Sequence, residues 1–195
     1  MNWLSWIDEL MQLIHLSGVV FPNTLRWLGL LWLIQLVNMS CRYRLNLLGI
    51  HPRHWIGVPG IFCAPFLHGS VEHLFFNSVP LVFLLTLMQL FGEQLFIIVS
   101  LFIIVVSGVA VWLLARPGIH VGASGVLMGY WGFLLVQVYC QPSVMGVIIA
   151  LLCLYYLGSL WLNLFPSSRK TSWEGHVFGC LAGGLAAFYY QAQLG

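Results

Sequence analysis

The sequence predicts an all-α membrane protein with six transmembrane helices, and two observations support this fold class. Hydrophobic residues make up 61% of the 195 residues and charged residues only 6%, whereas a soluble domain carries about a quarter charged residues. Six apolar segments also approach the ~20 residues that a spanning helix needs. A charge at the bilayer centre costs at least ~2.5 kcal/mol, and the few charged residues lie largely at the ends of these segments.

The chain is expected to form a single membrane domain, 1–195, that begins with an interfacial segment at 1–22. This segment holds Trp3, Trp6 and two acidic residues, which suit the membrane surface. It lacks the Lys or Arg of a cleaved signal peptide, so the N-terminus is expected to remain. The expected spans are about 23–40, 73–91, 94–115, 122–140, 143–165 and 174–191.

The long loop at 41–72 is expected to be structured and partly embedded in the membrane. It is rich in Arg, His, Pro, Gly and Trp, and its stretch "GVPGIFCAPF" is too apolar for a simple connector. Non-helical backbone is tolerated at membrane depth only where protein or water satisfies its polar groups. The sequence "RHW" at 53–55 is interpreted as an anchor for this loop.

Four polar side chains fall at the starts of three spans that must run in the same direction. His73 and Asn77 begin the second span, Ser124 the fourth and His176 the sixth. At a rise of about 1.5 Å per residue, these side chains lie within about two helical turns in depth. Each is a functional candidate, because a polar residue in a membrane must face protein or a water-filled cavity.

Ser124 lies in the stretch "HVGASGVLMG", between Gly122 and Gly125. The two glycines permit a tight turn and a close backbone approach. A helix N-terminus offers free N–H groups that suit a developing oxyanion. A lone serine in a span is more often a packing residue, so its neighbours decide between the two interpretations.

His176 is a candidate general base for that serine, although a lone histidine is more often structural. It adjoins a stripe of small residues, a pattern that lets two membrane helices approach closely. The stripe consists of Gly175, Gly179, Gly183 and Ala187. A close approach to the fourth span would bring the imidazole within hydrogen-bond reach of Ser124.

The stretch "HGSVEHLFFN" supplies candidate oxyanion donors. His73 and Asn77 are four residues apart, hence on one helical face, and both can donate to an oxygen that gains charge. A metal site is not expected, because HExxH is absent and an HxxEH site needs one residue fewer between His68 and Glu72. No cofactor is expected, and the five cysteines form no CxxC pair.

Taken in order, these motifs resemble those of the rhomboid intramembrane serine proteases, and the resemblance extends from the first span to the C-terminus. HxxxxHxxxN occurs as His68, His73 and Asn77, GxSG as Gly122 to Gly125, and HxxGxxxG as His176, Gly179 and Gly183. The resemblance implies a rhomboid-like bundle with a Ser124–His176 dyad that lacks a carboxylate. It also implies an oxyanion hole from the Ser124 backbone N–H, His73 and Asn77, with His68 as support.

The resemblance further implies partners and a location. Single-pass transmembrane proteins would be cut near the membrane boundary in a bacterial inner membrane, with lipid but no nucleic acid as a partner. The 163–174 segment would form a mobile cap and gate. One departure is Met128, four residues after the serine, where many relatives carry an aromatic ring that supports the histidine.

The charge distribution conflicts with the orientation that the resemblance implies. Among the seven Lys and Arg residues, only Arg26 lies outside the odd-numbered loops, so the positive-inside rule would place the active-site face in the cytoplasm. Bacterial rhomboids open on the extracytoplasmic side. That orientation is expected here, because arginines in a structured loop can be paired. The basic residues in the odd-numbered loops are Arg42, Arg44, Arg53, Arg116, Arg169 and Lys170.

Three alternatives to a general intramembrane protease stay open. One is a sorting-type rhomboid that trims C-terminal anchors from exported proteins. Another is a non-catalytic membrane chaperone that binds transmembrane helices, which the presence of both Ser124 and His176 disfavours. A transporter is disfavoured because no charged residue lies in mid-span to couple an ion.

Overall fold

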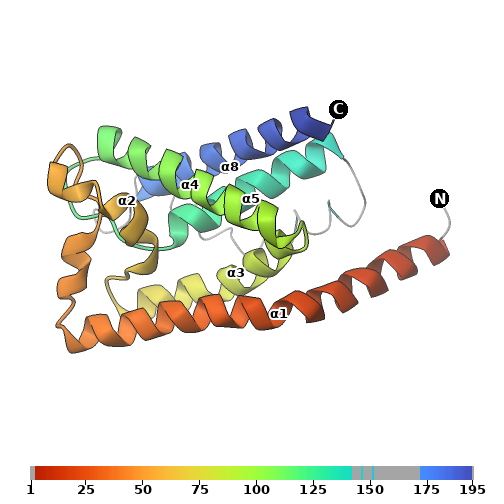
Figure 1. Ribbon diagram of the computed structural model, residues 1–195, viewed down its shortest axis with the longest axis horizontal. Helices are drawn as coiled ribbons and strands as arrows, with labels where there is room; N and C mark the ends of the chain where they lie inside the picture. Colours follow the sequence, from red (N-terminus) through yellow and green to blue (C-terminus); the bar gives the residue numbers. More distant parts are fainter. Residues whose placement is uncertain (1–2, 142–145, 147–150, 152–171, 195) are drawn as a thin grey trace.

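The computed structural model describes residues 3–141, 146, 151 and 172–194, which form a bundle of long helices without a β-strand among them (Figure 1). The predicted all-α membrane fold is confirmed. Within the described ranges, the helical segments long and apolar enough to cross a membrane are Leu10–Ser40, Val71–Gln89 and Glu93–Leu114. The α-helices are α1 Trp3–Ser40, α2 Gly60–Cys63, α3 Val71–Gln89, α4 Glu93–Leu114, α5 Ser124–Cys140 and α8 Trp173–Leu194; the 3₁₀ helices are η1 Arg44–Leu48, η2 Trp55–Gly57 and η3 Ala64–Phe66.

The expected second, third, fourth and sixth spans correspond to α3, α4, α5 and α8, with ends shifted by at most three residues. The fifth expected span, 143–165, lies outside the described residues except for positions 146 and 151, and so does most of the 163–174 segment. Figure 1 shows α3, α5 and α8 starting at one end of the bundle, while α1 and α4 run in the opposite direction. The common direction places Ser124 and the N-terminal ends of α3 and α8 at the same end.

The segment 1–22 and the first expected span are parts of one helix, because α1 begins at Trp3 and runs through Pro22 without a break. The location of 1–22 at the membrane surface stays a prediction. An interior proline costs about 3 kcal/mol in a helix. In an apolar environment, however, the backbone has no water to bond with, so an apolar run stays helical across a proline. Close to the expected boundary, Gln89 at the end of α3 donates to the Thr24 hydroxyl at 2.8 Å. The earlier part of α1 continues beyond α3 (Figure 1).

The core lies between α3, α4, α5 and α8, and α5 contributes its largest buried side chains. Trp131 and Phe133 are at most 2% exposed. Because the side chains of α5 fill the centre, its first residue, Ser124, is held at the end of a rigid element. Such a position suits a functional group that needs fixed geometry.

The 41–72 loop is structured and packs over the end of the bundle where α5 begins. Ile50 and His120 exchange two backbone hydrogen bonds of 3.0 and 2.9 Å. Arg53 donates through Nη1 to the carbonyls of Leu113 and Ala115, at 3.2 and 2.8 Å. An arginine at a helix C-terminus satisfies carbonyls that have no partner within the helix, so Arg53 anchors the loop to the end of α4.

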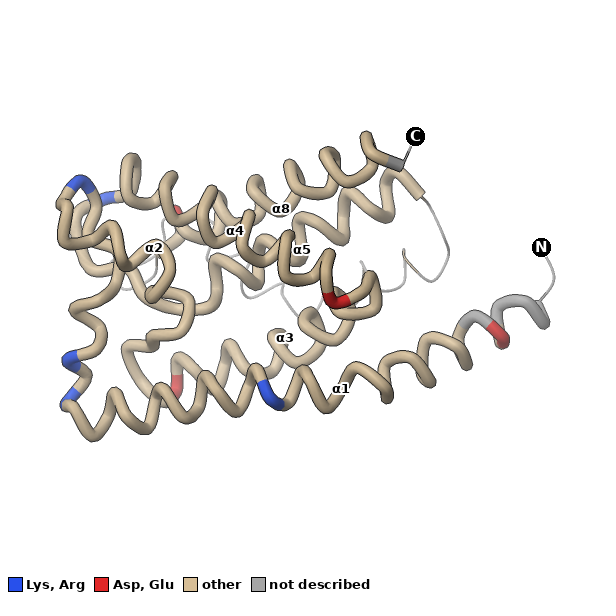
Figure 2. The backbone as a smooth tube through the Cα atoms, in the orientation of Figure 1, with Lys and Arg blue, Asp and Glu red and all other residues tan. Residues whose placement is uncertain are grey.

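Basic residues gather at the end of the bundle where α3, α5 and α8 begin, as Figure 2 shows. Within α1 the basic position is Arg26, whose side chain donates to Asn23 at 2.7 Å. Two of the basic residues at this end have protein partners. Arg53 donates to the carbonyls of Leu113 and Ala115, and Arg116 pairs with Glu174 at 3.1 Å.

Candidate active site

Ser124 is the first residue of α5 and follows a turn that only glycine adopts readily. Gly122 has a φ of +129°, a conformation that strains any residue with a Cβ. Its N–H donates to the carbonyl of Ala64 at 2.9 Å, which ties the turn to the 41–72 loop. The turn therefore fixes the direction in which the serine leaves the loop and enters the helix.

The His73 ring and the Ser124 hydroxyl lie on the same side of Gly122. A Cβ built on Gly122 would be 3.1 Å from His73 Nε2 and 3.8 Å from Ser124 Oγ. A side chain at Gly122 would crowd the His73 ring, since its Cβ would lie 2.9 Å from His73 Cε1. A substrate carbonyl bound beside this glycine would present its carbon to the Ser124 hydroxyl and its oxygen to the His73 N–H, which is the geometry that oxyanion stabilisation requires.

Asn77 lies one turn after His73 on α3 and is only 4% exposed. Ser70 caps this helix by accepting the His73 N–H at 3.0 Å, and the cap sets the start of the face that carries both side chains. The Asn77 amide nitrogen, Nδ2, is buried and has no hydrogen-bond partner within the described part of the chain. Buried donors are nearly always bonded, so this one is available for a ligand.

His68 is fully buried beneath the same turn. Its Nε2 accepts the backbone N–H of Ala123 at 3.3 Å, and its ring meets that of His73 edge to face, with centroids 5.2 Å apart. Burial, and then the neighbouring His73, lower the pKa of His68 to about 3. The neutral ring is the form that accepts from Ala123, so His68 supports the residue directly before the serine.

His176 lies in the first turns of α8 and is 5% exposed. The segments that carry it and Ser124 are in backbone contact, because a Cβ on Gly125 would lie 3.2 Å from the carbonyl oxygen of Gly175. The contact continues along both helices: a Cβ would lie 2.0 Å from the Gly125 oxygen if placed on Gly179, and 1.7 Å from the Gly129 oxygen if placed on Gly183. The small-residue stripe therefore faces α5.

A cavity of about 50 Å³ opens beside Ser124, between α4, α5 and the start of α8. Its polar lining includes the side chains of Ser107, His120 and Ser172. A cavity of this size with several polar partners has room for water. Among the described residues, no group of three or more His, Cys, Asp and Glu side chains is arranged to hold a metal ion.

Met128 is fully buried in the core of the bundle. Sequence reasoning did not assign a role to Ser172 and Glu174, which contact the loop before Ser124. A signal for Ser172 was present in the sequence, because serine is a typical N-cap residue and Ser172 directly precedes the apolar segment that forms α8. In the structure its Oγ accepts the Gly175 N–H at 3.4 Å.

Comparisons with known proteins show the family to which the chain belongs. The model of the Rhomboid domain family matches residues 55–193. An uncharacterised protein of Mycobacterium tuberculosis is 33% identical over 177 residues, which cover 86% of this chain and 74% of the relative. One from Mycobacterium leprae is 32% identical over 178 residues, covering 86% and 70%. This chain, a helical membrane protein, therefore belongs to the rhomboid family.

Proposed function

We propose that the protein is an intramembrane serine endopeptidase that cuts single-pass transmembrane proteins near the membrane boundary. Rhomboids include serine proteases that act within membranes, and relatives that lack activity also occur. The observation that carries the proposal is the arrangement around Gly122: the Ser124 hydroxyl and the His73 ring lie within 4 Å of one point. The unpartnered Asn77 amide on the same helix as His73 adds a second donor.

In the first chemical step, His176 takes the proton of the Ser124 hydroxyl and the serine oxygen attacks the scissile carbonyl carbon. The carbonyl π electrons move to its oxygen, which becomes an oxyanion. Asn77, His73 and the Ser124 N–H donate hydrogen bonds to that oxyanion. His176 then gives its proton to the leaving amine, and an acyl-enzyme remains on Ser124.

In the second step, water attacks the acyl carbon while His176 again serves as the base. Water would reach the serine through the cavity beside it, whose lining includes Ser107, His120 and Ser172. The serine leaves with the proton, and the free enzyme is restored. No cofactor takes part in this sequence. The closely packed glycines at the start of α5 and α8 support the alignment of the two residues.

Two other functions fit the same fold and are distinguished by experiment. A sorting-type rhomboid would use the same dyad on C-terminal membrane anchors of exported proteins. A non-catalytic chaperone would bind transmembrane helices without cutting them, and it would need neither Ser124 nor His176. The buried, unpartnered Asn77 donor favours a catalytic role, because such a group destabilises the folded protein unless a ligand uses it.

The deciding experiment incubates the purified protein in liposomes with a panel of single-pass substrates. Ser124→Ala and His176→Ala are expected to fold and to lose cleavage almost completely. Ser40→Ala and His15→Ala make the same changes at exposed positions of α1 and are expected to cleave at the parental rate. Cleavage by Ser124→Ala at that rate would overturn the mechanism.

We further propose that the active site opens on the extracytoplasmic side of a bacterial inner membrane. The basic residues at that end argue against this, but Arg53 and Arg116 have protein partners. Cys41 and Cys140 are both exposed and lie at opposite ends of the bundle. A membrane-impermeant thiol reagent on intact cells is expected to label a variant with only Cys41 and to spare one with only Cys140. The reverse pattern would place the site in the cytoplasm.

A further inference from the structure

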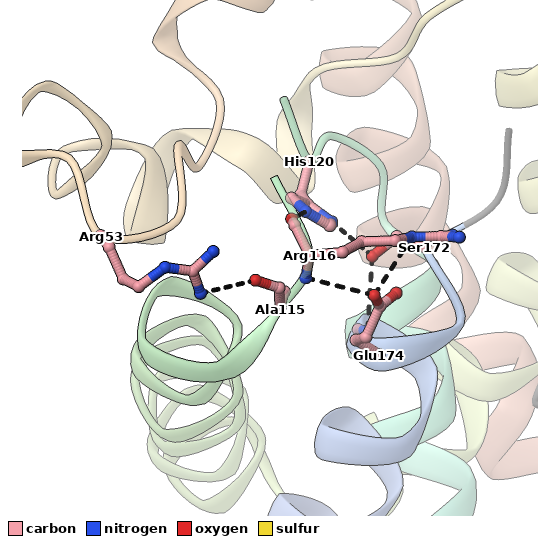
Figure 3. A network of polar contacts seen from close by, with 7 residues as sticks. Arg53, Ala115, Arg116, His120, Ser172 and Glu174 are labelled. Atoms are coloured by element: carbon pink, nitrogen blue, oxygen red, sulfur yellow. Dashed lines mark hydrogen bonds and ion pairs between the residues drawn. The ribbon is translucent and has the colours of Figure 1, made fainter. Parts of the chain in front are cut away.

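Two short segments that carry the proposed dyad are joined by polar contacts that the catalytic chemistry does not use. The first is the loop between α4 and α5, which leads to Ser124, and the second is the start of α8, which leads to His176. Figure 3 shows these contacts. His120 precedes Ser124 by four residues, and Ser172 precedes His176 by four. The contact between His120 and Ser172 therefore lies four residues before each member of the dyad.

His120 and Ser172 form a directed chain of hydrogen bonds. His120 Nε2 lies 3.0 Å from the carbonyl oxygen of Arg116, and a carbonyl only accepts, so Nε2 carries a proton. In the neutral ring Nδ1 then accepts from the Ser172 hydroxyl, at 2.6 Å. The Ser172 oxygen in turn accepts the Gly175 N–H. Each polar atom in this chain has a partner of the right kind.

Arg116 and Glu174 form a second link between the same two segments. The Arg116 Nε lies 3.1 Å from Glu174 Oε1, and the Arg116 backbone N–H donates to the same oxygen at 3.3 Å. The Glu174 side chain is 6% exposed, whereas that of Arg116 is 35% exposed. A buried carboxylate with a charged donor and a backbone donor has defined geometry. Glu174 is also two residues before His176.

The loop before Ser124, which contributes one partner to each link, is itself bonded to the 41–72 loop. Ile50 pairs with His120 through two backbone hydrogen bonds, and Arg53 bonds the carbonyl of Ala115 (Figure 3). The loop before Ser124 is therefore fixed to the 41–72 loop, and the start of α8 is fixed to the loop before Ser124. Movement of one dyad segment relative to the other would break these contacts.

We propose that His120, Ser172, Arg116 and Glu174 form a clasp that positions Ser124 and His176 relative to each other. These are positioning residues, and the inference rests on the proposed protease function. The clasp sets the rotation of the first turn of α8. It acts on the rate of the chemical step, because a dyad is productive only when its two members are placed to well within 1 Å. Substrate binding does not depend on this placement and is left unchanged.

The test compares five variants with wild type in two assays: the kcat and KM for a single-pass substrate in liposomes, and the rate at which a fluorophosphonate labels Ser124. The variants are His120→Ala, His120→Asn, His120→Gln, Ser172→Ala and the double variant that combines His120→Ala with Ser172→Ala. Asparagine can place an acceptor near the Nδ1 position and so keep the link to Ser172. Glutamine can place a donor near the Nε2 position, which keeps only the bond to Arg116 inside the loop.

His120→Ala and Ser172→Ala are each expected to lower kcat and the labelling rate by about ten- to a hundredfold, with KM within about twofold of wild type. The double variant should be no slower than the slower single one, because both remove the same link. His120→Asn should restore most of the rate and His120→Gln should not. A purely structural role would not separate these two amides.

Equal rates for His120→Ala and wild type, in an assay where Ser124→Ala is inactive, would overturn the clasp and leave the protease function standing. Equal rescue by the two amides, or a change in KM with kcat intact, would also overturn it. Cleavage by Ser124→Ala at the parental rate would instead overturn the protease function, and the clasp's positioning role with it. His15→Ala, exposed on α1, serves as the control for histidine removal.

Discussion

Replacing Gly179 by alanine tests whether the close approach of α5 and α8 aligns the proposed dyad. The added Cβ would lie 2.0 Å from the carbonyl oxygen of Gly125, whereas carbon–oxygen contacts settle at about 3.3 Å. Because the opposing atom is backbone and cannot rotate away, the helices must separate locally by about 1 Å. A misplacement of this size costs about a hundredfold in rate, and overpacking costs about 1–3 kcal/mol of folding free energy.

Gly184→Ala is the matched control, since it adds the same methyl group to the same helix. There the Cβ would lie 3.7 Å from Val136 Cγ2, an ordinary contact. We expect Gly179→Ala to lose about a hundredfold in cleavage rate and to unfold at a lower temperature in detergent. Gly184→Ala should match wild type in both measurements. If the two variants behave alike, the contact between Gly179 and Gly125 does not align the site.

Two further predictions concern α3 and the turn beneath the serine. Asn77→Ala should lower kcat by about 10²–10³-fold with little change in the unfolding temperature, because its Nδ2 bonds no other described residue; an unchanged kcat would exclude it from the oxyanion hole. His68 has a folded pKa of about 3 against an ordinary 6.5, so the unfolded chain binds its proton first and stability falls as pH drops below 6.5. From pH 7 to 5 the free energy of unfolding should fall by about 2 kcal/mol more in wild type than in His68→Gln, as measured by denaturation in detergent; equal pH dependence would contradict this.

Much of the fold could be predicted, because hydropathy alone determines which segments suit a bilayer. The ends of α3, α4, α5 and α8 follow from their polar flanks. The continuity of α1 was not predicted, because the tryptophans and acidic residues of 1–22 indicated a separate segment at the membrane surface. In an apolar medium the backbone has no alternative partner, so the helix continues to Trp3.

The site was predictable only where spacing along one helix carries the information. His73 and Asn77 share a face because they are four residues apart, and the stripe that includes Gly179 predicts a close helix contact. The bond between His120 and Ser172 joins residues 52 positions apart. Nothing in the sequence around either residue specifies its partner, so the hydrogen bond is seen only once α8 is packed against α5.

The glycine contacts and the clasp supply different constraints, and a site in a membrane requires both. Glycine carbonyl contacts fix how near α5 and α8 lie, but they are not directional, and without side chains they resist sliding or rotation only weakly. Lipid adds no restoring force, because it solvates the apolar faces as well as a neighbouring helix does. Hydrogen bonds at Ser172 and Glu174 are directional, so they can set the rotation that the glycines leave open. This explains why the polar contacts lie within four residues of His176, where a small rotation displaces the imidazole most directly.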